Sequence, residues 1–161
     1  MILPYSKVGG EWSIPDPIMV GLWDKAIKQG VDRKTFRGQS IVDSGQFLAL
    51  MQTQGILPLL CVDDFNPVCV AWLNSIGEKH GFCHFFFFKE FWGKAEQYGN
   101  EILDYWFQLV ETIVGILTPD NRLAIQYAAK VGFVRLGEIP HVGVFFYKTR
   151  DAHGNRKQQT G

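Results

Sequence analysis

The stretch GFCHFFFFKEFWGKAEQYGNEILDYWFQLVETIVGILT, residues 81–118, decides the fold. Its first part is apolar at every position from Phe85 to Phe88, without polar alternation. Residues 94–109 then place apolar side chains at helical spacing, and residues 110–118 form a second strand-like run. A strand, a helix and a strand in this order predict a βαβ unit with parallel strands. Because a strand covered on both faces is apolar throughout, we expect Phe85–Phe88 to be doubly buried core.

The residues before this unit predict two helices and a hairpin. Residues 16–30 begin with an Asp-Pro pair, which is typical of an N-cap and a first turn, and end on a glycine. A second helix is predicted over residues 44–54. The apolar runs 56–64 and 68–76 flank an Asn-Pro turn and predict an antiparallel hairpin. Residues 1–15 are expected to form an extended lead-in with a Gly-Gly turn.

The residues after the unit predict a capped helix followed by two strands, 134–139 and 142–150. The tail, residues 151–161, has almost no apolar content, and we expect it to be disordered. The chain shows neither an internal repeat nor a dividing linker. We therefore predict one α/β domain over residues 1–150.

Composition and charge restrict the function. The chain holds 16 basic and 16 acidic residues, so its formal net charge is zero, and we expect no nucleic-acid partner. No apolar run approaches the roughly 18 residues of a membrane span, and the first twelve residues lack the regions of a secretory signal. The three cysteines, Cys61, Cys69 and Cys83, are odd in number and form no CxxC pair. They favour free thiols in a reducing cytoplasm.

A second cluster of interest is formed by His80, Cys83 and His84, which are residue types that bind zinc. They straddle a predicted turn and strand, and the chain has no second ligand pair at zinc-like spacing. We therefore expect no metal site.

The order of elements and one motif carry a resemblance to a known family. The motif is NRLAIQYAAKVGFVRLGEIP, residues 121–140. With it, residues 16–150 resemble the GNAT superfamily of acyl-CoA-dependent N-acetyltransferases, in which an N-x-x-A…K-x-G-F helix leads into a strand with a nearby glycine. The matching positions are Asn121, Ala124, Lys130, Gly132, Phe133 and Gly137. The aromatic segment that ends in FWGK, residues 91–94, is also similar to small acetyltransferase-like proteins of phages and prophages.

The resemblance implies an α/β fold of GNAT type, with a central mixed twisted sheet flanked by helices on both faces, and a site for acetyl-CoA. In the family two central parallel strands splay apart, and the pantetheine arm of CoA pairs with their freed backbone groups. The pyrophosphate lies on N–H groups at the N-terminus of the next helix. The implied cofactor-binding residues are Phe87, Phe88, Trp92, Gly93, Lys94, Ala95, Asn121 and Ala124.

Residues 92–97 depart from the family's phosphate-binding pattern. The family has Arg or Gln, two residues, Gly, one residue, then Gly or Ala. This chain has Trp92, Ala95 and Gln97 at those positions. Lys94 offers a cation to a phosphate, but Glu96 adds a repelling charge. The departure predicts weak binding of CoA, binding in another register, or none.

Acetyl transfer to an amine needs a base, an N–H that stabilises the oxyanion and an acid for the departing thiolate. The resemblance places the oxyanion donor on the backbone near Phe87 or Phe88. The family's acid is often a tyrosine at the position held here by Ala128. The adjacent Tyr127 is therefore the candidate acid, with packing as the alternative. His84 and Glu90 are the candidate bases, with a structural role as the alternative for His84.

We predict an acetyl-CoA-dependent N-acetyltransferase whose acceptor is a small-molecule or protein amine. The alternative is a catalytically degenerate GNAT-fold module that binds a protein partner, which residues 92–97 and Ala128 favour. Gly115, in the middle of a predicted strand, indicates either a bulge or the close approach of a ligand. The aromatic edge Val144–Tyr147 is suited to pairing in a homodimer.

Overall fold

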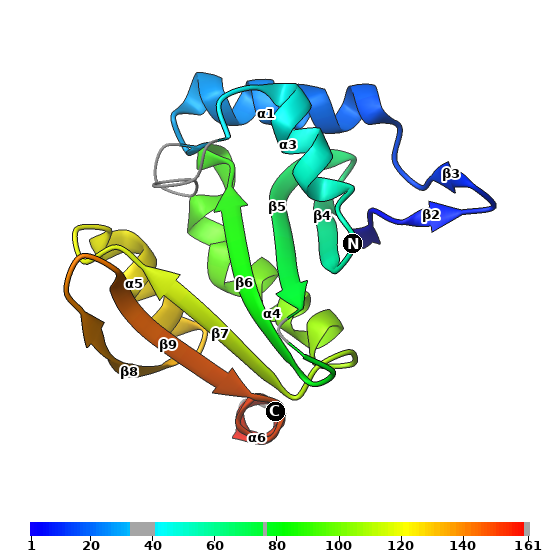
Figure 1. Cartoon of the computed structure of the whole chain (residues 1–161). Coiled ribbons are helices and arrows are strands. Elements are labelled where there is room, and N and C mark those ends of the chain that lie inside the picture. Colours follow the sequence, from blue (N-terminus) through cyan, green and yellow to red (C-terminus); the bar gives the residue numbers. More distant parts are fainter. Residues whose placement is uncertain (33–40, 76, 160–161) are drawn as a thin grey trace. The chain divides into compact units, whose positions relative to one another are not determined.

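The computed structural model of the chain describes residues 1–32, 41–75 and 77–159 (Figure 1). The strands of its main sheet are β1 (Ile2–Pro4), β4 (Ile56–Asp63), β5 (Asn66–Ser75), β6 (His80–Phe87), β7 (Thr112–Leu117), β8 (Val134–Ile139) and β9 (Gly143–Thr149). Within the described residues these seven strands form one mixed sheet, flanked by helices, in the order β1-β4-β5-β6-β7-β9-β8. Strands β6 and β7 run parallel and are joined through helix α4 (Ala95–Trp106), which confirms the predicted βαβ unit.

The chain forms two compact units, which we describe separately. Unit 1 consists of Met1–Asn74 with His84–Lys94, and unit 2 consists of Ser75–Cys83 with Ala95–Gly161. Strand β6 contributes its first part to unit 2 and its aromatic part to unit 1. The assignment of residues 1–150 to one domain stays a prediction. No helix in the described part of the chain is long and apolar enough to span a membrane.

Unit 1 is built around an aromatic core. Helices α1 (Asp16–Gln29) and α3 (Ser44–Met51) supply buried side chains to it, together with β4, β5 and the aromatic end of β6. Trp23 of α1 stacks on Phe47 of α3, with ring centroids 5.1 Å apart, and Phe47 contacts Phe86 of β6. Helix α1 ends at Gly30, whose φ of 65° is a left-handed conformation that glycine adopts at little cost. Both predicted helices are therefore present, and the predicted hairpin is confirmed by the antiparallel pairing of β4 with β5.

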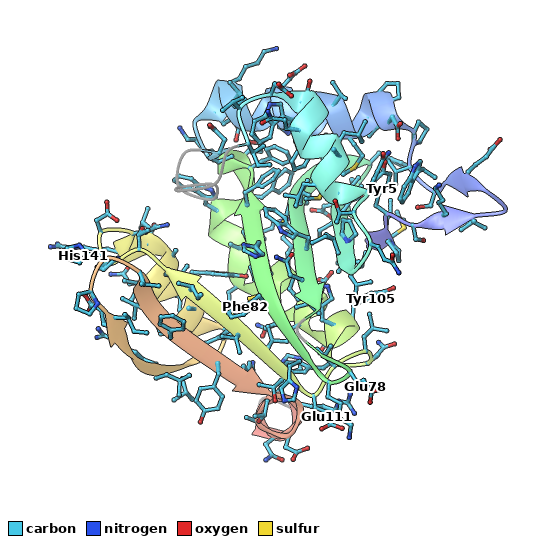
Figure 2. The ribbon with its side chains drawn as sticks, viewed as in Figure 1. Tyr5, Glu78, Phe82, Tyr105, Glu111 and His141 are labelled. Carbon is cyan, nitrogen blue, oxygen red and sulfur yellow. The ribbon has the colours of Figure 1, made fainter. Side chains whose placement is uncertain are left out.

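The N-terminal residues are extended, as predicted, and the first of them also join the main sheet. Strand β1 pairs antiparallel with β4, and β2 (Lys7–Val8) and β3 (Glu11–Trp12) form a hairpin through the predicted Gly-Gly turn. Tyr5, labelled in Figure 2, is buried, and its hydroxyl donates to the Asp16 carboxylate at 2.8 Å and accepts from the Gln52 amide at 2.7 Å. Burial raises the pKa of Tyr5 to about 12. Asp16 thus binds Tyr5, and the N-cap position predicted for it is held by Pro15.

The side chains of the phenylalanine run divide between the two faces of β6. Phe86 and Phe88 are buried in the core of unit 1, and Phe86 contacts both Trp72 and Phe88 edge-on. On the opposite face Phe85 and Phe87 stack on each other, with centroids 6.2 Å apart. Burial is confirmed for Phe86–Phe88, whereas Phe85, nearer the start of the strand, is half-buried.

In unit 2 strand β9 lies between β7 and β8 and pairs antiparallel with both. The prediction that Val144–Tyr147 form an edge of the sheet is therefore wrong, since these residues are in β9 and the edge strand is β8. Gly115 of β7 lies opposite Phe146 in a continuous register, which excludes the bulge predicted as one of its two roles. A Cβ atom at Gly115 would contact the Cys83 sulfur at an ordinary 3.6 Å.

The tail differs from its prediction of disorder. Arg150–Gln159 form helix α6, and residues 160–161 lie outside the described residues, as does Ile76 of the predicted second hairpin strand. His153 of α6 is buried, packs on Phe107 and bonds the Asp104 carboxylate of α4. One buried histidine with a carboxylate partner thus holds a segment whose average composition predicts disorder.

Candidate functional site

The backbone of β6 provides the first element of the candidate site. The parallel ladder between β6 and β7 starts at His80 opposite Thr112 and ends at Phe82 opposite Val114. Both strands are longer than this ladder, since β6 continues to Phe87 and β7 to Leu117. Backbone N–H and C=O groups require hydrogen-bond partners, so a strand that leaves a ladder is suited to pairing with an extended ligand.

The backbone groups of Phe87 and Phe88, the two strand positions implied for the cofactor, have different hydrogen-bond partners. The N–H of Phe88 donates to the Val68 carbonyl at 3.0 Å and is thereby committed to the β5 side. Successive residues of a strand alternate in direction, so Phe87 presents its backbone groups to the opposite edge. There the Phe87 carbonyl accepts a hydrogen bond from the Trp92 indole Nε1 at 3.1 Å. The Phe88 N–H is therefore not available for an oxyanion role.

The turn after β6 is a 3₁₀ helix, η1 (Lys89–Lys94), which is bound to the C-terminal part of α1. The N–H of Lys89 donates to the Gln29 side-chain carbonyl at 2.7 Å. The Glu90 carboxylate pairs with Lys25 at 2.6 Å and accepts from the Gln29 amide at 2.7 Å. Lys25 also lies 4.2 Å from the centroid of the Phe88 ring, a cation–π contact. These contacts fix the start of η1.

The pKa of Glu90 is lowered to about 2, chiefly by the hydrogen bond from Lys25 and further by the hydrogen bond to its backbone. Its carboxylate is therefore ionised and bonded at every physiological pH. A carboxylate this acidic has little driving force to take a proton from an amine. Glu90 is thus the weaker of the two candidate bases.

The residues implied for phosphate binding lie in η1 and at the start of α4. Trp92 is 49 % exposed, and the Lys89 ammonium is 6.0 Å from the centroid of its ring. The Lys94 ammonium is 3.5 Å from the Asp63 carboxylate, which uses part of its charge. Gly93 is exposed, with open space where a Cβ atom would stand, and Ala95 is the first residue of α4. Protein groups thus engage Trp92 and Lys94.

His84 differs from Glu90 in being largely buried and in having a ring nitrogen without a hydrogen-bond partner among the described residues. Its ring stacks on Trp72 at 4.9 Å between centroids and 8° between planes. Burial lowers the pKa of His84 to about 4, so the imidazole is neutral near pH 7. Its Nε2 atom is buried and has no hydrogen-bond partner among the described residues. A buried polar atom left unpaired costs stability and needs a reason, which makes His84 the better candidate base.

In unit 2 the implied residues lie on helix α5 (Arg122–Lys130). Asn121 caps this helix, and its side-chain oxygen accepts from the Ala124 N–H at 3.3 Å. Ala128 is buried, whereas Tyr127 is half-buried and its hydroxyl lies against Gly99 of α4. A Cβ atom at Gly99 would stand 1.8 Å from that hydroxyl. This contact was not predicted. Its signal in the sequence was Gly99, a glycine in the middle of the helix predicted over residues 94–109.

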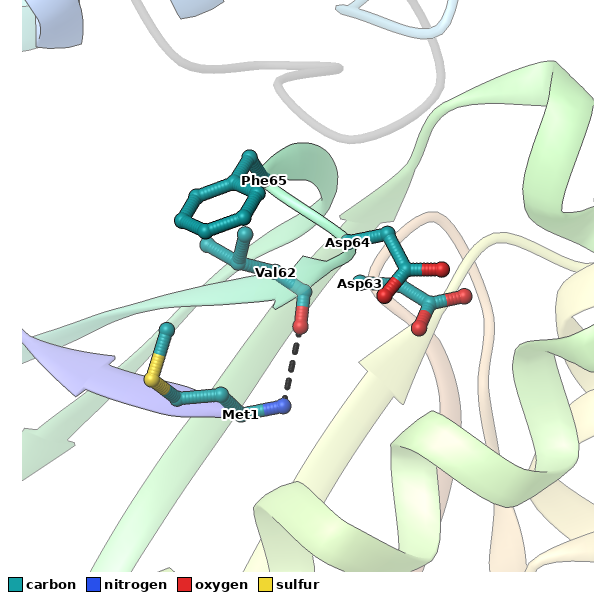
Figure 3. A pocket seen from close by; sticks show the side chains of 5 residues that line it. All are labelled: Met1, Val62, Asp63, Asp64 and Phe65. Carbon is teal, nitrogen blue, oxygen red and sulfur yellow. Dashed lines mark hydrogen bonds between the residues drawn. The ribbon is translucent and has the colours of Figure 1, made fainter.

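A pocket that was not predicted from the sequence lies at the tip of the β4–β5 hairpin. It has a volume of about 320 Å³ and is lined by Met1, Val62, Asp63, Asp64 and Phe65 (Figure 3). Asp64 and Phe65 both have positive φ, 45° and 64°, and Phe65 is 98 % exposed. The Asn66 side-chain amide donates a hydrogen bond to the Asp64 carbonyl, which stabilises the turn. An aromatic residue in a two-residue turn was the available signal.

Cysteine and metal chemistry complete the description. All three cysteines are free thiols, with Cys61 and Cys69 buried in the sheet. Within the described residues no group of three or more histidine, cysteine, aspartate or glutamate side chains could hold a metal ion.

This arrangement, a mixed sheet with parallel β6 and β7 joined by α4 and a capped α5 before the last strands, is the GNAT fold of acyl-CoA N-acyltransferases. Solved structures share it. The chain is similar to the aminoglycoside acetyltransferase AAC(6')-Ib in complex with ribostamycin and coenzyme A, with a TM-score of 0.73 and 14% identity over 88% of this chain and 93% of that one. It is also similar to the N-acetyltransferase PseH of Campylobacter jejuni in complex with acetyl coenzyme A, with a TM-score of 0.65 and 16% identity over 86% and 94%.

A third similar structure is spermidine N-acetyltransferase from Vibrio cholerae in complex with CoA and spermine. Its TM-score is 0.73, with 14% identity over 96% of this chain and 98% of that one. No protein-family model and no curated protein matches the sequence. The predicted fold class is therefore confirmed by structure, at a level of identity where sequence alone carries little of the likeness.

Proposed function

We propose that this protein is an acetyl-CoA-dependent N-acetyltransferase that acts on a small-molecule amine. The observation that carries the proposal is the short parallel ladder of β6, which ends at Phe82 within a GNAT fold. In this proposal the pantetheine arm pairs with the β6 backbone after that residue. The complexes of similar proteins with ribostamycin and with spermine support an amine of the same chemical class as the acceptor.

The proposed chemistry uses two groups of unit 1. The Nε2 atom of His84 accepts a proton from the amine, whose nitrogen then forms a bond to the thioester carbonyl carbon. The backbone N–H of Phe87 stabilises the resulting oxyanion. When the carbon–sulfur bond breaks, the nitrogen loses its second proton and the departing CoA thiolate takes up a proton from solvent. The role of Tyr127 as the acid stays a prediction, because its hydroxyl lies against Gly99. Products are the N-acetylated amine and free CoA.

The remaining implied residues receive roles in cofactor binding. We assign the phosphates of CoA to the segment from Trp92 to Ala95 and to the start of α5, at Asn121 and Ala124. Since Lys94 is paired with Asp63 at a distance of 3.5 Å, a phosphate would compete with a carboxylate for this ammonium. Binding of CoA is therefore expected to be weaker than it would be if Lys94 had no carboxylate partner. It is also expected to weaken further as salt is added.

The test is a calorimetric titration with acetyl-CoA, followed by an assay of thiol release with ribostamycin and with spermine as acceptors. We expect saturable binding and thiol release that depends on the amine. A Kd of about 1 mM corresponds to a binding free energy of only about −4 kcal/mol. If acetyl-CoA did not bind at this concentration, the proposal that the protein is an acetyltransferase would be rejected.

The assignment of the base has its own test. His84→Gln should lower kcat by about 100-fold or more while acetyl-CoA still binds. His141→Gln is the matched control, because His141 is exposed in the β8–β9 turn (Figure 2) and should not change kcat. Full activity of His84→Gln would overturn the base and leave the N-acetyltransferase proposal standing.

A second candidate is a non-catalytic module that binds a protein partner, for which the similarity of residues 91–94 to phage proteins suggests a host or particle protein. The hydrogen bond from Trp92 to the Phe87 carbonyl favours it, because the cofactor would need that acceptor. The absence of a tyrosine at Ala128 favours it too. In either case free thiols at Cys61 and Cys69 fit a reducing compartment, and we place the protein in the cytoplasm.

A further inference from the structure

Strand β8 is an unprotected edge of the sheet. It ends the strand order of unit 2, and all six of its residues are exposed. Three are large and apolar: Val134 is 51 % exposed, Leu136 64 % and Ile139 51 %. Natural edge strands are usually shortened, charged or covered, because their unpaired backbone groups attract another strand. An edge this apolar indicates a partner.

A bulge sets the pattern of side chains along β8. Arg135 lies opposite Phe146 of β9 and Gly137 lies opposite Phe145, so Leu136 is one extra residue. As a result Arg135 and Glu138 point to the same face, where they form an ion pair at 3.0 Å.

Without the bulge, two residues three apart would lie on opposite faces. The register also places Val134 and Ile139 on the other face. Their partners on β9, Tyr147 and Gly143, are an even number of residues apart and therefore point to the same face. Strand β8 thus has two charged and two apolar positions arranged symmetrically about its middle.

We propose that β8 pairs antiparallel with β8 of a second copy of this chain, about a two-fold axis between Leu136 and Gly137. In this register Arg135 lies opposite Glu138 of the partner subunit, and Val134 lies opposite Ile139 of the partner subunit. Leu136 lies opposite Gly137 of the partner subunit, where a Cβ atom would meet nothing within 4 Å. This single register therefore pairs opposite charges, pairs apolar side chains with each other, and places a large residue beside a small one.

Self-complementarity selects a second copy over another extended chain. A two-fold axis repeats each cross-strand pair, so the dimer contains two Arg–Glu pairs and two Val–Ile pairs. A parallel in-register pairing would instead place like charges side by side. The Arg135 and Glu138 side chains, 58 % and 44 % exposed, are free to exchange their intramolecular pair for intermolecular ones.

The charges give the first test, made on the full chain by sedimentation velocity over a range of concentrations. The wild type should dimerise, and Arg135→Glu and Glu138→Arg should each raise the dimer Kd by about tenfold or more, because each change repeats across the axis. The double variant Arg135→Glu/Glu138→Arg should restore dimerisation. A monomeric wild type, or a double variant no better than the single ones, would overturn the proposal.

The register gives the second test. A Val134→Cys/Ile139→Cys variant should form a disulfide-linked dimer under mild oxidation, since these positions face each other across the axis. Each single variant, and the wild type with its three native thiols, should link far less. Equal linking by a single variant, or none by the double variant, would show that another surface joins the copies. All four substituted positions are exposed, so thermal unfolding should confirm that every variant is folded.

Discussion

Two segments carry the residues implied for cofactor and catalysis, and they are held in different ways. In residues 84–94 of unit 1 the polar groups bond to partners far along the chain, such as Gln29, 61 residues from Glu90. In residues 121–133 of unit 2 the contacts are mostly local, and Asn121 caps its own helix three residues on. The first segment is fixed by α1 and β5, and the second by helix geometry.

The difference bears on function. A segment fixed by distant partners has fewer groups left for a ligand, and its one unbonded buried atom, His84 Nε2, is conspicuous among the described residues. A segment fixed by local geometry keeps its structure when a single side chain is changed. Mutations should therefore have large and partner-dependent effects in residues 84–94, and small effects in residues 121–133 except where Tyr127 meets α4.

The largest expected effect is the pH dependence caused by His84. Its folded pKa of about 4 lies below the ordinary 6.5, so below pH 6.5 the unfolded chain binds a proton that the folded chain does not. Stability is then complete above pH 6.5 and is lost as the pH falls toward 4. At 1.36 kcal/mol per pH unit, reduced for partial exposure, the loss should be about 2–3 kcal/mol. Urea unfolding at several pH values measures it.

The matched variants are His84→Phe, which keeps a ring on Trp72, and His141→Gln at an exposed position. In His84→Phe the loss between pH 6.5 and 4 should shrink, whereas His141→Gln should behave as the wild type. An unchanged acid limb in His84→Phe would mean that other groups cause it and that His84 is not buried as described.

The next effect tests a long-range contact of the second segment, that of Tyr127 with Gly99. Gly99→Ala should destabilise the protein by about 1–2 kcal/mol, because the new methyl group overlaps the Tyr127 hydroxyl. Gly21→Ala in α1 is the control, since a Cβ atom there meets nothing, and it should stabilise by up to about 1 kcal/mol. In a Tyr127→Ala background Gly99→Ala should lose its cost. A harmless Gly99→Ala in the wild type would place Tyr127 elsewhere.

Local patterns made most of the fold predictable. The βαβ unit, the hairpin and the glycine that ends α1 follow from periodicity and turn chemistry within short windows. The errors arose where a remote partner decides the outcome. Helix α6 exists through His153 and its contacts with α4, and β9 is interior because β8 turns back beside it.

The candidate site was less predictable for the same reason. Spacing predicted a capped helix, whose cap in the structure is Asn121, but it could not show that Lys25 and Gln29 hold Glu90. It could not show that the Trp92 indole reaches back to the Phe87 carbonyl, because that contact depends on the rotamer adopted in η1. Spacing specifies which residues share a face, whereas side-chain partners are set by packing.

Trp92 gives a smaller effect that sharpens the comparison. If its indole occupies an acceptor that acetyl-CoA requires, Trp92→Phe should tighten acetyl-CoA binding by about three- to tenfold, or about 1 kcal/mol. Calorimetry measures the change. Trp12→Phe, on the β2–β3 hairpin, is the control and should leave the affinity unaltered. Weaker binding by Trp92→Phe would instead identify Trp92 as a contact of the cofactor.

The smallest effect concerns the ion pair that fixes η1. Glu90→Gln should cost about 0.5 kcal/mol at pH 7, since the Lys25–Glu90 pair is partly exposed and screened by salt. The lowered pKa fixes the sign of the pH dependence: the contribution is present above pH 4.5 and is lost as the pH falls toward 2. Wild type and Glu90→Gln should therefore converge in urea unfolding at pH 2. Lys79→Gln serves as the control, because the Lys79–Glu111 pair is a similar exposed ion pair away from η1 in the sequence. If Glu90→Gln also changed acetyl-CoA affinity while Lys79→Gln did not, the position of η1 would be coupled to cofactor binding. The tight attachment of residues 84–94 would then belong to the function and not only to the fold.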